Sequence, residues 1–233
     1  MKIGGLQRLT LIDYPKKTAC TLFIAHCNFR CPWCYAPELV VPEKIKEHEE
    51  ITEEYFFEFL KKRKNKLDGV VICGGEPTLS PQLPSLVERI KKEGFLVKID
   101  TNGSNPEIIE SLAQNNLLDY VAVDIKHRLN EKDYQRATGV KVDVSKIKQT
   151  AEFLINGTLP YEFRTTLVPQ MHQKEDVESI ASEIKGAEKY FLQNFYPQKT
   201  IDPSLLSLKP FSKEQMEEFK NIARKFVKSC QTR

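Results

Sequence analysis

The sequence predicts an α/β fold in which helices cover a parallel sheet. Six apolar, β-rich segments alternate with six segments of helical periodicity, and no internal repeat, low-complexity tract or long linker interrupts them. With 233 residues and 40% hydrophobic content, the chain can bury one substantial core. Such alternation fits an open doubly wound sheet or a partial (β/α) barrel. We therefore expect a single domain over residues 1–233.

The expected elements follow from apolar runs and capping residues. The predicted strands are 18–26, 69–75, 95–103, 119–126, 161–170 and 189–197. The predicted helices are 52–67, 83–94, 105–116, 143–156, 173–186 and 212–229. Thr52 followed by acidic residues is typical of a helix start, and Gly94 is typical of a helix end. The domain then consists of an N-terminal extension (1–16), a core (17–197), and a loop with a C-terminal helix (198–233).

Charge and hydropathy exclude several classes of protein. The net charge is +3, from 35 basic and 32 acidic residues, so nothing indicates a nucleic-acid or membrane partner. The basic run 61–66 closes an amphipathic helix and is interpreted as a solvated helix end. No run of 18 apolar residues occurs, and the N-terminus lacks a signal-peptide pattern. We expect a soluble cytoplasmic protein, whose thiols stay reduced and serve metal binding or catalysis.

Three cysteines, Cys27, Cys31 and Cys34, lie at C-x3-C-x2-C spacing after the first predicted strand. A structural zinc site takes four ligands, and no fourth lies nearby, so a zinc knuckle is the less favoured alternative. Three thiolates on a short loop suit an iron–sulfur cluster with one iron left open for a ligand. The remaining cysteines stand alone and are interpreted as packed or incidental: Cys20, Cys73 and Cys230.

Polar or glycine-rich residues end four of the other five predicted strands, and the strand predicted at 161–170 carries Arg164. The four strand ends are "GGEP" (74–77), "DTNG" (100–103), "DIK" (124–126) and "QNFYP" (193–197). Taken alone, the glycines fit a turn and an acidic residue fits a helix cap. The carboxyl ends of parallel strands meet at one edge of a sheet, where ligands bind in this class of fold. Together with the cysteine loop, these segments predict a functional site at that edge.

The cysteine motif with Trp33 before its last cysteine resembles that of radical S-adenosylmethionine (SAM) enzymes. The later motifs occur in the order of that family, over almost the whole chain. "KIGGLQRLTLIDYP", "PEL" after the cysteines and "QNFYPQKTIDP" resemble the activating proteins of glycyl-radical enzymes. The nearest likeness is to the longer form of anaerobic ribonucleoside-triphosphate reductase activating protein. This resemblance implies a partial (β/α)6 barrel of the radical SAM type.

The resemblance also implies a reaction. Cys27, Cys31 and Cys34 would hold a 4Fe–4S cluster, whose open iron binds the amino and carboxylate groups of SAM. One electron from a flavodoxin or ferredoxin then cleaves SAM to methionine and a 5′-deoxyadenosyl radical. The hydrogen donor would be a glycine of a glycyl-radical enzyme, most directly an anaerobic ribonucleotide reductase. Because the cofactor carries the chemistry, no acid–base residue is expected.

The resemblance assigns a set of residues to SAM. They are Trp33, Gly74, Gly75, Glu76, Asp100, Asn102, Lys126, Arg164 and Asn194. Trp33 would meet the adenine, segment 74–76 the methionine amino group, and Lys126 the carboxylate or ribose. Asn194 would reach the adenine or ribose. Arg164 needs a partner if it is buried, and Asp124 or the cofactor would supply it.

Three further residues match a monovalent-cation site: Asp100, Thr101 and Asp124. The chain departs from many relatives at Tyr35 and Ala36, where those carry His-Asn. The histidines are interpreted as structural or incidental, with two of them in polar loop or helix-start contexts (His48 and His172) and two beside motifs (His26 and His127).

Two other functions remain as alternatives. One is a radical SAM enzyme that acts on a small molecule, as 7-carboxy-7-deazaguanine synthases do. The other is a zinc-binding module without catalytic activity. Segment 200–212 is loop-like and fits a cover for the site, a docking segment or a simple connector to the last helix.

Overall fold

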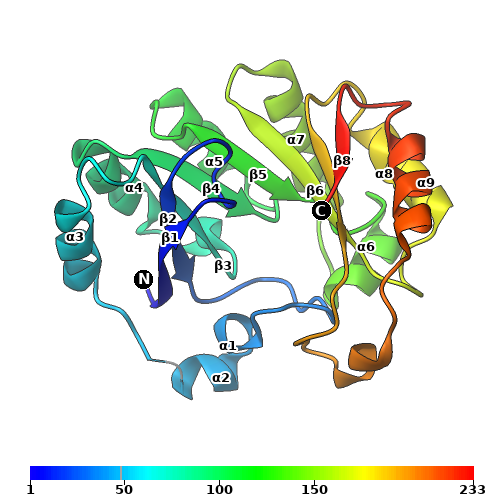
Figure 1. The fold of residues 1–233 in the computed structure, drawn as a ribbon, viewed down its shortest axis with the longest axis horizontal. Coiled ribbons are helices and arrows are strands. Elements are labelled where there is room, and N and C mark those ends of the chain that lie inside the picture. The colour runs from blue at the N-terminus through cyan, green and yellow to red at the C-terminus, as the bar shows by residue number, and fades with distance from the viewer. Residues whose placement is uncertain (48) are drawn as a thin grey trace. The chain divides into compact units, whose positions relative to one another are not determined.

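The computed structural model describes residues 1–47 and 49–233, so His48 lies outside the described residues. Its strands follow one another across an eight-stranded sheet in sequence order (Figure 1). They are β1 (Ile3–Thr10), β2 (Ala19–Ile24), β3 (Gly69–Gly74), β4 (Leu96–Thr101), β5 (Tyr120–Asp124), β6 (Tyr161–Leu167), β7 (Tyr190–Asn194) and β8 (Cys230–Thr232). β1 runs antiparallel to β2, whereas β2 to β4 are parallel, as are β6 to β8. The predicted α/β class with a mainly parallel sheet is confirmed.

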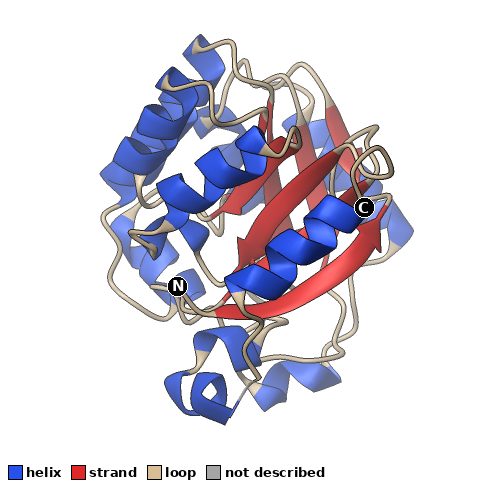
Figure 2. Ribbon diagram, turned by 90° about the vertical axis from the view of Figure 1, so that its left-hand side faces the viewer, coloured by secondary structure: helices blue, strands red, loops and turns tan. Residues whose placement is uncertain are grey.

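All six predicted helices are present, shorter by a few residues at their ends. The α-helices are α1 (Pro37–Val40), α2 (Pro42–Glu47), α3 (Glu53–Lys62), α4 (Leu83–Lys92), α5 (Pro106–Gln114), α6 (Glu131–Thr138), α7 (Val144–Asn156), α8 (Lys174–Glu183) and α9 (Lys213–Ala223). Two 3-10 turns, η1 (Pro77–Leu79) and η2 (Pro203–Ser207), accompany them. Thr52 caps α3 as predicted, because its hydroxyl accepts a hydrogen bond from the Tyr55 amide. Figure 2 shows helices lying along the strands.

Three α-helices and two strands were not predicted, because their sequence patterns are short or weak. α1 and α2 have only four and six residues and begin at Pro37 and Pro42. α6 is mostly polar, so its apolar period is weak; it is defined by its Asn130 cap and by Gly139 in the left-handed region. β1 lies in the predicted N-terminal extension and β8 follows the last helix. Cys230, interpreted from sequence as incidental, is buried in β8.

The chain forms two compact units, described here separately. Unit 1 comprises 1–28, 36–101 and 107–121, and unit 2 comprises 29–35, 102–106 and 122–233. In unit 1, the centre of β3 is wholly buried, as are apolar side chains of α3 and α4 such as Phe56 and Ile90, and α4 contacts β4. In unit 2, α9 contacts β7 and β8, and α8 and α9 contact each other. Each unit therefore has its own buried core.

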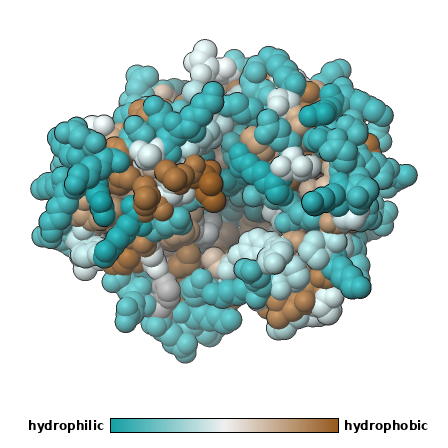
Figure 3. All heavy atoms as spheres, viewed as in Figure 1, coloured by the Kyte–Doolittle hydropathy of each residue, from teal (hydrophilic) through white to brown (hydrophobic). Residues whose placement is uncertain are grey.

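An apolar surface patch lies at the end of β1 in unit 1 (Figure 3). Leu9 is exposed in the strand, and Leu11 and Ile12 in the turn after it are 69% and 82% exposed. This turn precedes β2, so it lies at the end of β2 remote from the cysteine loop. Among the described residues, no helix combines the length and apolar character needed to cross a membrane.

Candidate functional site

The cysteine loop follows β2, and none of its three cysteines is in a disulfide. Cys31 is 7% exposed, and Cys27 and Cys34 are partly exposed. The Cys34 amide donates to the Cys31 carbonyl oxygen at 3.0 Å, which closes a tight turn between these two cysteines. In unit 2, the Arg30 amide donates to the carbonyl of Thr138 at 2.7 Å and joins the loop to the end of α6. The loop is thus fixed by its main chain while its thiols remain available as ligands.

Gly74 and Gly75 let the end of β3 run against the backbone that follows β2. The amides of Gly75 and Glu76 donate to the carbonyls of Ile24 and His26, both at 2.7 Å. A Cβ on Gly74 would lie 2.4 Å from the Ile24 oxygen, and one on Gly75 would lie 2.0 Å from the His26 oxygen. Gly74 also has φ +117°, which disfavours other residues. These glycines are needed for contact between two protein segments, whatever they do for a ligand.

The Glu76 carboxylate is an internal hydrogen-bond acceptor in unit 1. It is buried, and its Oε1 accepts from the amide and hydroxyl of Thr78, at 3.1 and 2.5 Å, and from the hydroxyl of Thr101 at 2.8 Å. Buried carboxylates are tolerated when donors satisfy them in this way. Glu76 therefore ties the end of β3 to the end of β4.

Lys98 is a charged residue of β4 that sequence reasoning missed. Its side chain is 1% exposed, and its ammonium group forms an ion pair with Asp100. The ammonium also lies 6.0 Å from the ring centre of Tyr120. A lysine within the apolar run "LVKID" was the signal available, since lysine is almost never fully buried without a partner.

Asp124 lies beside two positively charged side chains in unit 2. The Arg164 guanidinium binds it with two parallel hydrogen bonds, from Nε to Oδ1 at 3.0 Å and from Nη2 to Oδ2 at 3.1 Å. The Lys126 ammonium lies 3.6 Å from Oδ2. Arg164 is 12% exposed, and bidentate geometry makes this a strong pair. Of the two partners expected for Arg164, Asp124 is the one that the structure shows, and contact of Arg164 with the cofactor stays a prediction.

Protein cations therefore reach both aspartates of the predicted monovalent-cation site. Lys98 neutralises Asp100 in unit 1, and Arg164 with Lys126 neutralises Asp124 in unit 2. Thr101, the third predicted ligand, directs its hydroxyl to Glu76. An added cation is not required to balance these carboxylates, and the cation site stays a prediction.

The two asparagines assigned to SAM make local contacts. The Asn102 side chain accepts from the Ser104 amide at 3.0 Å and shapes the turn after β4. The Asn194 side chain donates to the Phe211 carbonyl at 2.7 Å and accepts from its amide at 3.1 Å. Asn194 thus fastens the segment before α9 to the end of β7. Their contacts with SAM remain predictions.

Trp33 is buried and meets a histidine that sequence reasoning treated as incidental. Its ring lies 5.8 Å from that of His172, at an interplanar angle of 73°. His172 was expected in a polar loop or at a helix start, but it is 2% exposed and stacks on the buried His127 at 4.8 Å. Burial, with a smaller effect of the nearby His127, lowers the pKa of His172 from 6.5 to about 4. His172 is therefore a neutral, fixed side chain beside the cysteine loop.

Tyr35, which directly follows Cys34 at a position where many relatives differ, has a structural role. Its hydroxyl accepts from the Tyr196 amide at 2.9 Å, and its ring stacks on Phe195 at 6.4 Å. Burial raises the pKa of its hydroxyl. In unit 2, the amide of Asp202 donates to the carbonyl of Pro32 at 2.9 Å. The segment after β7 therefore packs on the cysteine loop.

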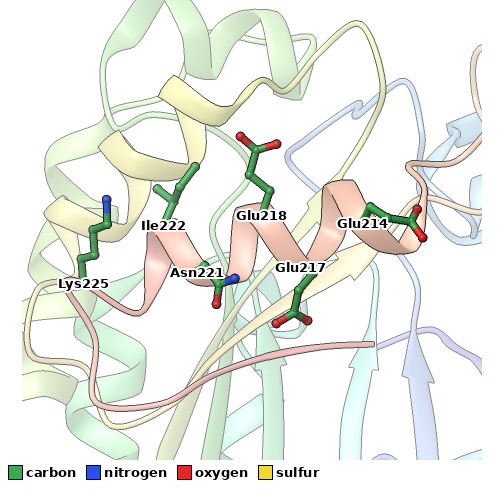
Figure 4. A pocket seen from close by; sticks show the side chains of 6 residues that line it. All are labelled: Glu214, Glu217, Glu218, Asn221, Ile222 and Lys225. Carbon is green, nitrogen blue, oxygen red and sulfur yellow. The ribbon is translucent and has the colours of Figure 1, made fainter.

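A separate hollow of about 520 Å³ lies along α9. Figure 4 shows its lining side chains projecting from one helix and the residues after it: Glu214, Glu217, Glu218, Asn221, Ile222 and Lys225. None of them was predicted to bind a cofactor, and a hollow lined from one helix encloses little of a ligand. It is not part of the candidate site.

Comparison with known proteins decides the family. The model of the radical SAM superfamily matches residues 21–184, which include the cysteine loop and the ends of β2 to β6. The chain belongs to the radical SAM superfamily. It is therefore an enzyme whose chemistry uses a 4Fe–4S cluster and SAM.

Two relatives and one solved structure refine this membership. A candidate glycyl-radical enzyme activating enzyme of Methanocaldococcus jannaschii is 36% identical, over 97% of this chain and 92% of its own length. This similarity supports membership of the activating-enzyme family. The 7-carboxy-7-deazaguanine synthase of Thermococcus kodakarensis is 26% identical, over 82% of this chain and 78% of its own. Streptococcus suis SuiB bound to SAM shares the fold, with a TM-score of 0.66 at 14% identity over 91% of this chain and 51% of that one.

Proposed function

We propose that this radical SAM enzyme activates a glycyl-radical enzyme by abstracting hydrogen from a backbone glycine. The observation that carries the proposal is the 36% identity to an activating-enzyme relative over nearly the full length of both chains. An anaerobic ribonucleoside-triphosphate reductase is the partner we propose, and a flavodoxin or ferredoxin is the proposed electron donor.

The donor set of the cysteine loop fits the cluster. Three cysteines within eight residues, none of them in a disulfide, provide the soft ligands that iron–sulfur clusters take. Cys27, Cys31 and Cys34 would each bind one iron. When bound, the cluster supplies the electron that cleaves SAM to methionine and a 5′-deoxyadenosyl radical. The hydrogen atom would come from the partner glycine, which would be left as a glycyl radical while 5′-deoxyadenosine is released.

The protein residues would bind and orient SAM. Lys126 offers a positive charge to the SAM carboxylate, held near Asp124 and Arg164. The main chain at 74–76 would accept hydrogen bonds from the methionine ammonium group. Trp33 would face the adenine with its backbone. The other candidates are Asp100, Asn102, Arg164 and Asn194, which already make the internal contacts described above.

The cluster ligands are tested by single substitutions. Cys27→Ala, Cys31→Ala and Cys34→Ala should each reduce the iron and sulfide content after anaerobic reconstitution. Cys20→Ala is the matched control. Cys20 is wholly buried in β2, and burial raises its pKa to about 12, so it is a poor source of thiolate. Full cluster content in a Cys27, Cys31 or Cys34 variant would contradict the assignment.

The function is tested with the reductase from the same genome. Cluster-loaded enzyme, SAM and dithionite should generate the electron paramagnetic resonance doublet of a glycyl radical on the reductase. Variants of the reductase glycine should lack this signal. Efficient cleavage of SAM without the signal would overturn the proposal.

A second candidate function rests on a specific similarity. Because a 7-carboxy-7-deazaguanine synthase matches 82% of the chain, a small-molecule substrate of that kind is the alternative. The same loaded enzyme, incubated with 6-carboxytetrahydropterin, would then release 7-carboxy-7-deazaguanine. Formation of that product, together with a silent reductase, would establish the alternative.

A further inference from the structure

The peptide of Lys126 is held from both sides in unit 2. Its N–H donates to the hydroxyl of Tyr134 at 3.1 Å, and its C=O accepts from Nε2 of His172 at 2.9 Å. The residue before it is fixed as well, since the Ile125 carbonyl accepts from the Thr165 hydroxyl at 2.9 Å. These hydrogen bonds leave the main chain of Ile125 and Lys126 few alternative conformations.

The two groups that hold Lys126 also touch the cysteine loop. The Tyr134 ring meets Phe29 edge-on, with centroids 6.2 Å apart at 76°. The His172 ring meets Trp33 in the same manner, at 5.8 Å and 73°. Edge-to-face aromatic contacts fix ring orientation as well as distance. Each contact therefore connects the position of Lys126 to an aromatic residue of the cysteine loop: Phe29 lies two residues before Cys31, and Trp33 directly precedes Cys34.

The orientation of His172 is determined by its neighbours. Its Nδ1 accepts from the Val168 amide at 3.0 Å, so Nε2 carries the hydrogen that is donated to Lys126. His127 stacks on this ring, with centroids 4.8 Å apart, and is itself held by the Met171 carbonyl at 3.0 Å. A buried imidazole with both nitrogens bonded cannot turn without losing a hydrogen bond.

Tyr134 is equally constrained. It is wholly buried in α6, and burial raises the pKa of its hydroxyl, so it remains a neutral phenol. The end of α6 accepts the amide of Arg30 from the cysteine loop, and Gly139 packs against Arg30 so closely that a Cβ would lie 2.8 Å from its oxygen. α6 thus contacts the loop through its main chain and through Tyr134.

We propose that Tyr134 and His172 are positioning residues that hold Lys126 in a fixed place relative to the cysteine loop. The inference rests on the proposed role of Lys126 at the SAM carboxylate. Neither residue touches the cofactor in this proposal. They act by keeping the ammonium group aligned with Cys31 and Cys34, whichever substrate receives the radical.

The first test is Tyr134→Phe, which removes a single hydroxyl. In the cluster-free protein, exchange of the Lys126 amide hydrogen should accelerate at least about tenfold, since its acceptor is lost. In the anaerobically loaded enzyme, cluster content should be unchanged. The dissociation constant of SAM, measured from the change it causes in the resonance of the reduced cluster, should rise about tenfold, equivalent to one lost hydrogen bond.

Tyr161→Phe is the matched control. Tyr161 is another buried tyrosine of unit 2, and its hydroxyl accepts from the Glu188 amide at the same 3.1 Å. This change should accelerate exchange at Glu188 but leave Lys126 exchange and SAM affinity at wild-type values. Equal losses of SAM affinity in the two variants would show a general effect of destabilisation and overturn the proposal.

The second test places His172 and Lys126 in a double-mutant cycle. His172→Phe keeps a ring against Trp33 but loses both hydrogen bonds, and it should weaken SAM binding about tenfold. His172→Gln keeps an amide donor and should recover part of the affinity. In the Lys126→Met background, His172→Phe should cause no further loss, because it acts through Lys126.

The outcomes separate the two proposals. Additive losses in the cycle would show that His172 acts independently of Lys126 and would overturn the positioning role. If Lys126→Met binds SAM with wild-type affinity, Lys126 does not contribute to SAM binding. The positioning role of Tyr134 and His172 is then overturned too. The radical SAM chemistry, tested by iron content and SAM cleavage, would stand in either case.

Discussion

The ends of β3 and β5 provide the two best-defined parts of the candidate site, and they are built in opposite ways. The β3 end depends on missing side chains, because Gly74 and Gly75 lie against the backbone of Ile24 and His26. The β5 end depends on charged side chains and on buried rings that hold its main chain. At the β3 end, an added side-chain atom would clash with the backbone. At the β5 end, each substitution should remove one contact and have a smaller effect. Four changes test this difference.

The largest effect is expected from Gly75→Ala. The new Cβ would lie 2.0 Å from the His26 oxygen, a backbone atom that cannot move without separating two segments. The free energy of unfolding of the cluster-free protein should fall by more than about 3 kcal/mol, measured with urea. Gly94→Ala is the control: it has no atom within 4 Å, and only its φ of +92° opposes it, so about 1 kcal/mol is expected. Equal effects would mean that the backbone contact adds nothing.

The next effect is a pH dependence at the β5 end. Folded His172 has a pKa of about 4, whereas the unfolded chain binds the same proton near 6.5. Protonation therefore favours unfolding, and the free energy of unfolding should fall by up to about 3 kcal/mol as pH drops from 6.5 to 4. Urea unfolding across this range should give a smaller decrease for His172→Gln than for wild type. Identical pH profiles would contradict the assigned burial of the neutral imidazole.

Arg164→Met tests the charged part of the β5 end. The Asp124 carboxylate would then keep only the Lys126 ammonium, 3.6 Å away, as a cationic partner among the pairs described. The free energy of unfolding should fall by about 2 kcal/mol, because the pair is partly exposed. Adding Asp124→Asn should restore much of the loss, since the unpaired charge is then gone. Lys92→Met breaks an exposed pair with Glu88 and should cost less than about 0.5 kcal/mol. If Arg164→Met lowers the free energy of unfolding no more than Lys92→Met does, the Asp124–Arg164 pair does not stabilise the fold.

The smallest effect concerns the support of the β3 end. Thr101→Val removes one donor from buried Glu76 at nearly constant volume, so the unfolding free energy should fall by about 1 kcal/mol. Thr232→Val, an exposed position in β8, should change it by only a few tenths of that amount. If Thr101→Val is as mild as the control, Glu76 is satisfied by Thr78 alone.

Local patterns were sufficient to predict much of the fold. The parallel strands β2 to β7 and six helices follow from apolar runs and caps that each occupy a short stretch of chain. β1, β8 and α6 were missed because their patterns are short or polar and their stability comes from packing. β8, for example, has three residues and gains its place from pairing with β7.

The candidate site divides in the same way. Pairing of Arg164 with Asp124 or with the cofactor was expected because a buried arginine needs a partner, and the structure has it paired with Asp124. The partners of Tyr134 and His172 were not, since each contact joins residues brought together by the packing of elements.

The sequence by itself determined the chemistry of this protein: the thiol spacing, the alternation of strands and helices, and the residues at the strand ends. These are local features, because a ligand spacing or an apolar period is complete within a few residues. Only the tertiary structure decided which backbone Gly75 must avoid and which rings hold Lys126. Those contacts depend on distance in space, which packing sets and the order of residues does not state.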